Sequence, residues 1–108
     1  MAYVPAKDRE VIVRLLQEEE HVLTSCPHCG ANGRYVQHFI TAQGERKAAM
    51  RGCLKNAFYV HPLATQRRTW EKRLKQYPGW KTAERELARI DSDVARLFPC
   101  AATAGVGY

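Results

Sequence analysis

Residues 26–53 read CPHCGANGRYVQHFITAQGERKAAMRGC, and this stretch decides how the middle of the chain is expected to fold. It begins with a C-x-x-C pair, Cys26 and Cys29, and ends on a third cysteine, Cys53. A C-x-x-C turn supplies two of the four tetrahedral ligands of a structural zinc site. The residues between Cys29 and Cys53 are enough for two strands and their turns. The spacing therefore predicts a zinc-ribbon-like segment over residues 26–60 that holds a structural zinc ion.

The fourth ligand of this zinc site is the open point of the pattern. A second complete C-x-x-C turn would have a cysteine at position 56, where the chain has Asn56. Imidazole is an ordinary zinc ligand, and a short strand after Cys53 would return His61 to the site, so His61 is the predicted fourth ligand. His28 is disfavoured because it lies inside the turn that the C-x-x-C pair closes. The alternatives to His61 as fourth ligand are His21, His28, His38 and Cys100. A hairpin that binds no metal and is held by packing alone is a further alternative.

Two further uses of the cysteines fit the sequence less well. A redox C-x-x-C follows a strand and opens a helix, whereas Gly30 and Gly33 oppose a helix here. A catalytic zinc needs a general base nearby, and the only acidic residue of the ribbon-like segment is Glu45, in a predicted turn. We therefore predict no catalytic residues and expect that the chain is not an enzyme.

The predicted fold class is α+β, in one domain over residues 1–108. Apolar residues at three- and four-residue spacing, among them Val11, Leu15 and Leu16, predict an N-terminal helix over residues 6–23. Aromatic and β-branched residues predict a β-hairpin over residues 34–52, and AFYV at 57–60 supplies a possible third strand. Two C-terminal helices, a helical hairpin over residues 64–98, are separated by Pro78-Gly79, and residues 99–108 form a flexible tail.

The last predicted helix carries a continuous apolar seam. Its residues Trp80, Ala83, Leu87, Ile90, Val94 and Leu97 alternate spacings of three and four. Such a stripe usually packs inside its own domain, so we expect it to contact the N-terminal helix together with Trp70 and Leu74. The alternative is a homodimer interface through residues 80–98.

Charge is concentrated in the centre of the chain. The formal net charge is +6, and residues 34–83 hold eleven Lys and Arg against two Glu. Such a basic block fits phosphates or an acidic protein surface, and the alternative is a solvated face that serves solubility. The residues predicted to bind nucleic acid or a partner are Arg34, Arg46, Lys47, Arg51, Lys55, Arg67, Arg68, Lys72, Arg73, Lys75 and Lys81.

Composition limits where the protein is expected to act. No window approaches the roughly 18 consecutive apolar residues of a membrane span, and the first residues lack the pattern of a signal peptide. A close C-x-x-C pair in a reducing compartment is better suited to metal than to a structural disulfide. We therefore expect a cytoplasmic protein without a membrane partner.

Three short stretches carry a resemblance to a known family. They are CPHCG at 26–30, GRYV at 33–36, and RGC at 51–53 followed by AFYV at 57–60. Together they resemble the zinc ribbons of phage transcription activators of the Ogr/Delta type and, more loosely, ribbons at the start of some transposases. The resemblance implies zinc held by Cys26, Cys29 and Cys53, with the family's fourth cysteine falling near Asn56. It also implies activation of phage late genes through contacts with promoter DNA and host RNA polymerase.

These observations lead to two functional hypotheses. The first is a small phage- or plasmid-type regulator whose zinc ribbon scaffolds the fold while the basic block binds DNA, RNA or the transcription machinery. The second is a protein-binding inhibitor or adaptor, similar to an anti-CRISPR protein, that blocks a host defence or regulatory complex.

Overall fold

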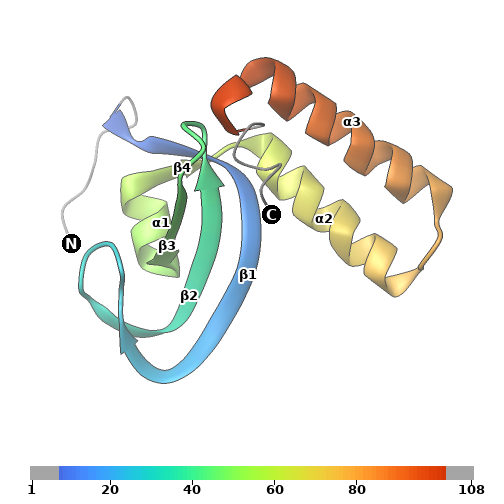
Figure 1. Cartoon of the computed structure of the whole chain (residues 1–108). Helices are drawn as coiled ribbons and strands as arrows, with labels where there is room; N and C mark the ends of the chain where they lie inside the picture. Colours follow the sequence, from blue (N-terminus) through green and yellow to red (C-terminus); the bar gives the residue numbers. More distant parts are fainter. Residues whose placement is uncertain (1–7, 102–108) are drawn as a thin grey trace.

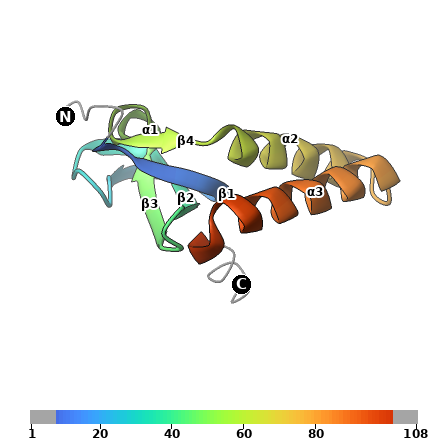
Figure 2. The same ribbon diagram turned by 90° about the horizontal axis from the view of Figure 1, so that it is seen from above.

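Four strands form one curled sheet in the order β3-β2-β1-β4, and two long helices extend from it (Figures 1 and 2). The computed structural model describes residues 8–101. β1 pairs antiparallel with β2, β2 pairs antiparallel with β3, and β4 lies parallel to the start of β1. The chain is therefore α+β, as predicted. Its elements are β1 (Glu10–Ser25), β2 (Asn32–Thr41), β3 (Arg46–Met50), α1 (Arg51–Ala57), β4 (Phe58–Val60), α2 (Pro62–Gln76) and α3 (Lys81–Leu97).

The predicted N-terminal helix over residues 6–23 is wrong, because this part of the chain forms β1 as far as the structure describes it. Ile12 and Leu15 are three residues apart and pack in the same core cluster. In a regular strand such residues point to opposite faces. The register of β1 against β2 shifts between Ile12 and Arg14, and this bulge returns Leu15 to the face of Ile12. The three-residue spacing that resembles a helix is thus produced by a bulged strand.

β1 and β2 are buried on both sides near residues 12–13 of β1 and 39–40 of β2. Ile12 and Phe39 belong to a core cluster that includes residues of β3, α1 and β4. Their chain neighbours Val13 and Ile40 belong to a second cluster, against which residues near the end of α3 pack. Both strands therefore need apolar residues at adjacent positions, which removes the simple alternation of a half-buried strand.

A buried glutamine closes the second bulge of β1. Between Leu15 and Glu18, β1 has one more residue than β2, so carbonyl groups there lose their ladder partners. The side chain of Gln37 is 3% exposed, and its Nε2 donates to the Leu16 carbonyl at 2.8 Å. Its Oε1 accepts a hydrogen bond of 2.7 Å from Arg68 of α2. One amide thus stabilises the bulge and attaches α2 to the sheet.

The C-terminal half agrees with the predicted helical hairpin. α2 and α3 pack against each other, and Ala83 and Ile90 of the seam are buried. Arg67 of α2 also forms an ion pair with Asp91 of α3. The predicted contact with an N-terminal helix is lost because that helix does not form, and the homodimer alternative stays a prediction. Within residues 8–101, no helix combines the length and the apolar composition that crossing a bilayer requires.

Two other predicted elements need correction. The predicted hairpin and third strand form as β2, β3 and β4, but residues 51–57 are helix α1 rather than extended chain. This segment has no β-branched residue and contains the helix formers Leu54, Lys55 and Ala57. In the predicted tail, residues 99–101 are helical and Ala101 is buried against the second cluster. Residues 102–108 lie outside the described part.

Replacing the buried amide tests the role assigned to Gln37. Gln37→Leu leaves the Leu16 carbonyl and the Arg68 guanidinium without their partner, so we expect the free energy of unfolding to fall by about 2 kcal/mol. Urea denaturation measures this change. Gln17→Leu, at an exposed site in the same bulge, is the matched control and should change stability by less than about 0.5 kcal/mol. Equal effects of the two variants would contradict the assignment.

Candidate metal centre

A tight turn between β1 and β2 holds the first two cysteines. The amide of Cys26 donates to the Ala31 carbonyl at 2.7 Å, and the amide of Gly30 donates to the Cys26 carbonyl at 2.9 Å. Gly30 has a φ of 79°, a conformation that side chains other than glycine rarely adopt. The turn therefore depends on glycine directly after Cys29, and it sets the sulfurs of Cys26 and Cys29 toward the same point.

Cys53 joins this pair from the first turn of α1. The sulfur atoms of Cys26, Cys29 and Cys53 all lie within 4.8 Å of one another. Metal–sulfur bonds of about 2.3 Å in a tetrahedral site place sulfurs about 3.8 Å apart, so small side-chain movements suffice. The three predicted cysteines could thus hold one metal ion that prefers thiolate ligands.

The candidate site is part of the main hydrophobic core. Cys26 is 3% exposed and Cys53 is 0% exposed, and both belong to the cluster that contains Phe39 and Phe58. Cys29 is exposed. A metal held here would fasten the turn between β1 and β2 directly to α1 and the core.

The two buried thiols have opposite proton affinities. Burial favours the neutral thiol of Cys26, but backbone N–H groups of Met50, Cys29 and His28 outweigh it and lower the pKa of Cys26 to about 7. The Met50 amide lies 3.3 Å from the Cys26 sulfur. Burial and the negative charge of the neighbouring thiolates raise the pKa of Cys53 to about 12. A bound cation would be needed to keep all three sulfurs ionised at neutral pH.

The histidine nearest the cysteines is His28, which the sequence analysis disfavoured. Its Nδ1 lies 3.0 Å from the sulfur of Cys53, and its ring packs edge-on against Phe58 with centroids 4.9 Å apart. The turn leaves the His28 side chain free to face Cys53 rather than the pair that flanks it. A partner 25 residues away along the chain gives no local sequence pattern, which explains why this contact was missed.

The other proposed fourth ligands lie elsewhere. His61 begins α2, where its Nδ1 accepts a hydrogen bond of 3.1 Å from the Leu63 amide and so caps the helix. His21 and His38 both pair with Glu19. Cys100 is exposed beyond the end of α3 and is not among the clustered cysteines of residues 8–101.

Much of the predicted basic block serves to pair with carboxylates. Arg51 makes a two-pronged contact with Glu18 at 2.7 and 3.0 Å, and its hydrogen bonds lower the pKa of Glu18. The Glu10 carboxylate likewise raises the pKa of Lys47. These cations balance acidic residues of β1 and the helices. The ion pairs are Arg34–Glu20, Lys47–Glu10, Lys47–Glu45, Arg51–Glu18, Arg67–Asp91, Arg67–Glu71 and Lys81–Glu84.

Four cations of α2 have no such carboxylate partner among the described residues. Arg68 contacts Gln37, Arg73 lies over the Trp70 ring at 4.7 Å, and Lys72 and Lys75 are exposed. We call Arg68, Lys72, Arg73 and Lys75 the α2 basic surface. Of the remaining predicted residues, Arg46 begins β3 and Lys55 lies exposed on α1. Five of the predicted cations therefore pair with carboxylates, and four others lie together on α2.

Comparisons of the chain with protein-family models, with curated proteins and with solved structures found no match.

The low pKa of Cys26 predicts a pH dependence in the metal-free protein. In the folded state one thiolate forms near pH 7, whereas the unfolded thiol ionises near its ordinary value of 9.0. This contribution to stability is therefore gained as pH rises from 7 to 9 and lost as pH falls through 7. The ultraviolet absorbance of thiolates should show one step near pH 7 that Cys26→Ser removes. A parent protein without a step below pH 8 would contradict the proposed hydrogen bonding of Cys26.

Proposed function

We propose that Cys26, Cys29 and Cys53 bind one structural zinc ion and that His28 supplies the fourth ligand. Zinc is favoured because thiolate and imidazole in a closed four-ligand set are typical of structural zinc sites. The supporting observations are the cluster of three sulfurs and the position of His28 Nδ1, which lies 3.0 Å from one of them, the sulfur of Cys53. His61 is replaced in this proposal because its Nδ1 already caps α2.

Two histidine variants test the zinc site. We expect protein purified without added zinc to contain about one zinc per chain by elemental analysis. His28→Ala should weaken zinc binding at least about tenfold in a competition with a chelator. His61→Ala, the matched control, should keep parent zinc affinity while it loses about 1 kcal/mol of stability with the α2 cap.

The opposite pattern would contradict this ligand assignment. If His61→Ala loses zinc and His28→Ala keeps it, the imidazole ligand is His61. If chelation leaves the thermal unfolding temperature unchanged, no structural metal is bound, because removal of an ion fastened to the core must lower stability.

We further propose that the chain is a small regulatory protein of phage or plasmid type that binds nucleic acid or the transcription machinery through α2. The observation that supports this is the α2 basic surface, where four cations remain after the other ion pairs have formed. Unpaired cations on one exposed helix are suited to phosphates. The resemblance of residues 26–60 to Ogr/Delta-type ribbons agrees with such a role, with the metal acting as scaffold.

Salt dependence tests nucleic-acid binding. We expect the parent to bind nucleic acid with an affinity that falls steeply as salt rises, measured by fluorescence anisotropy. In the triple variant Lys72→Gln, Arg73→Gln and Lys75→Gln, the slope of log affinity against log salt should shrink by about 0.7 to 0.9 for each of these cations that contacts a phosphate. Arg67 and Arg68 are left in place because they hold α3 and Gln37.

A control variant that loses the same number of charges distinguishes the effect of the α2 basic surface from the effect of total net charge. Lys55→Gln, Lys81→Gln and Arg85→Gln remove three cations from α1 and α3 and should leave the salt slope nearly unchanged. Equal losses in the two triple variants would show that only total charge matters. A parent that binds no nucleic acid at low salt would contradict the proposed function.

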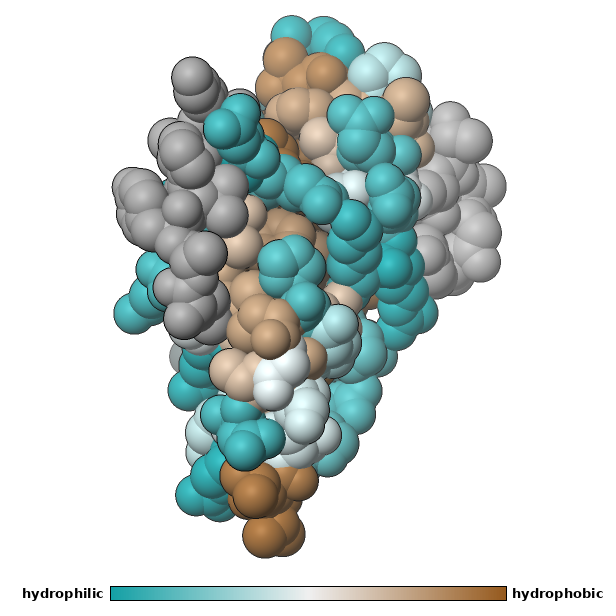
Figure 3. All heavy atoms as spheres, turned by 90° about the vertical axis from the view of Figure 1, so that its left-hand side faces the viewer, coloured by the Kyte–Doolittle hydropathy of each residue, from teal (hydrophilic) through white to brown (hydrophobic). Residues whose placement is uncertain are grey.

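An inhibitor or adaptor that binds a host protein is the second candidate. Val22 and Leu23 are 95% and 68% exposed, in the part of β1 where its register against β2 shifts a third time. The end of β1 lies at the lower end of the sheet in Figure 1, and the face drawn in Figure 3 shows an apolar patch at the lower end of the molecule. Large apolar side chains held in solvent mark interaction sites when they gather in a patch. This candidate predicts that Val22→Ser and Leu23→Ser abolish capture of a protein partner without affecting nucleic-acid binding.

A further inference from the structure

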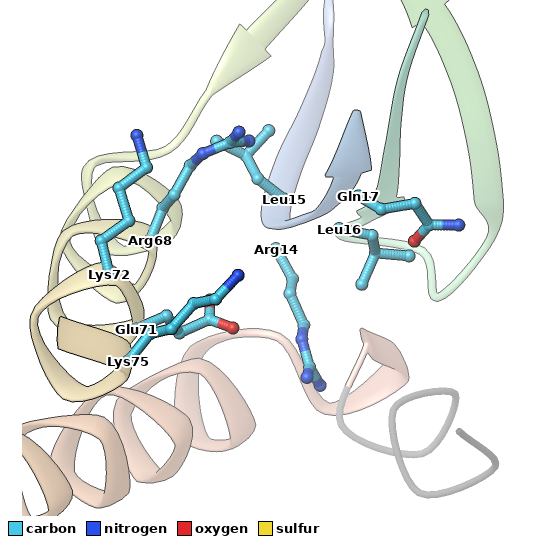
Figure 4. Close-up of a pocket in the computed structure, with 8 residues that line it drawn as sticks. All are labelled: Arg14, Leu15, Leu16, Gln17, Arg68, Glu71, Lys72 and Lys75. Atoms are coloured by element: carbon cyan, nitrogen blue, oxygen red, sulfur yellow. The ribbon is translucent and has the colours of Figure 1, made fainter. Parts of the chain in front are cut away.

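A groove of about 410 Å³ lies between β1 and α2, and its lining is strongly basic (Figure 4). β4 pairs only with residues Glu10–Ile12 of β1, so beyond Ile12 this edge of β1 is covered by α2 instead of a strand. The charged side chains that line the groove are Arg14, Arg68, Glu71, Lys72 and Lys75. β1 thus adds a cation, Arg14, to three members of the α2 basic surface.

Carboxylates near the groove are already engaged by other cations. Glu71, the acidic residue of the lining, pairs with Arg67 at 2.9 Å. Glu18 is close enough to Arg68 and Lys72 for their charges to lower its pKa, but its oxygens accept hydrogen bonds from Arg51. The groove therefore keeps an excess of positive charge that an anionic ligand would neutralise.

Arg14, which lines the groove, has an unused hydrogen-bond donor. Its Nε is buried and has no hydrogen-bond partner, and its side chain makes no ion pair with any residue of the described range 8–101. A buried unsatisfied donor destabilises the folded protein, and native structures rarely contain one without a reason. An anionic oxygen that entered the groove would satisfy the guanidinium and offset this cost.

Arg68 is held in position before any ligand arrives. Its hydrogen bond to Gln37 fixes the guanidinium against the bulge of β1, and Gln37 is itself held by the Leu16 carbonyl. Only one nitrogen of the Arg68 guanidinium makes this bond, so the others remain available. A fixed cation loses less side-chain entropy on binding than a mobile one.

The cations are spread along the groove rather than gathered at one point. In Figure 4, Arg68 reaches from α2 to β1 near one end, and Lys75 extends from α2 toward β1. Arg14 extends from β1 toward the end of α3. Lys72 points away along the outer side of α2. A single phosphate could not contact all of these groups, whereas a chain of phosphates could contact them in turn.

Exposed aromatic rings follow the last of these cations along the chain. Tyr77 and Trp80, directly after α2, are 59% and 40% exposed and line a second hollow of about 530 Å³. Their rings lie 6.1 Å apart. Exposed aromatics beside a cationic groove are the usual means of binding single strands, because unpaired bases can stack on them.

We propose that the groove between β1 and α2 binds the phosphate backbone of single-stranded nucleic acid through Arg14, Arg68 and Lys75, while bases stack on Tyr77 and Trp80. This inference rests on the proposed function and specifies its ligand and its site. It adds Arg14, which comes from β1 and lies outside the basic block predicted from the sequence.

The experiment measures anisotropy of a labelled single strand with three single variants. Arg14→Gln and Lys75→Gln should each weaken binding about tenfold and reduce the salt slope by about 0.7. Lys55→Gln, an exposed cation outside the groove, should bind like the parent. The single strand should also quench the fluorescence of the chain's two tryptophans, Trp70 and Trp80, and inorganic phosphate at the same phosphate concentration should not displace it.

Three results would each overturn the proposal that the groove binds a single strand. The first is that both Arg14→Gln and Lys75→Gln bind the single strand as tightly as the parent. The others are that a duplex binds as tightly as the single strand, or that inorganic phosphate displaces the single strand. If the triple variant of α2 still loses binding in those cases, the proposed function stands and only the groove is rejected. If the parent binds no nucleic acid, both are rejected. Should Arg14→Gln not fold, Arg14→Lys replaces it. This variant keeps the positive charge but loses the planar guanidinium, so it should weaken binding while the salt slope stays unchanged.

Discussion

The packing of β1 on both of its faces is the constraint on which the rest of the structure depends. Ile12 and Val13 are adjacent, yet they belong to different core clusters. β1 also bulges as it pairs with β2, and a bulge frees backbone carbonyl groups from the ladder. Gln37 satisfies the carbonyl of Leu16 and, in the same step, binds Arg68. The bulge of β1 therefore helps to position α2, through the hydrogen bond between Gln37 and Arg68, and so helps to form the groove between β1 and α2.

The cysteine cluster attaches the turn between β1 and β2 to the small hydrophobic core. The turn between β1 and β2 contributes few apolar side chains, and the neighbouring residues Pro27, His28 and Cys29 are exposed. Cys26 and Cys53 bring this turn to the core cluster through sulfur rather than through hydrocarbon. Domains of about a hundred residues have little stability to spare, so a metal held by these sulfurs would cross-link the turn to the core and stabilise it.

Sequence patterns were sufficient where one local rule decided the structure. The hairpin of β2 and β3, both long helices and the grouping of Cys26, Cys29 and Cys53 follow from propensity, periodicity and ligand spacing. Sequence patterns were insufficient where a residue far away in the sequence determined the local structure. The bulges of β1 turned a strand pattern into an apparent helix, His28 faces Cys53 across 25 residues, and Arg14 meets α2 only in the folded chain. Each failure comes from a contact between segments far apart in sequence.

The same composition of basic residues serves two purposes, and the structure separates them. Cations on β2, β3 and α1 face the acidic residues of β1, so Arg34, Lys47 and Arg51 help to align strands. Arg67 and Asp91 similarly join α2 to α3. A formal charge of +6 that was spread evenly would serve mainly solubility. Because these pairs neutralise one another, the surplus remains on α2 beside the exposed aromatic rings, where a polyanion can use it.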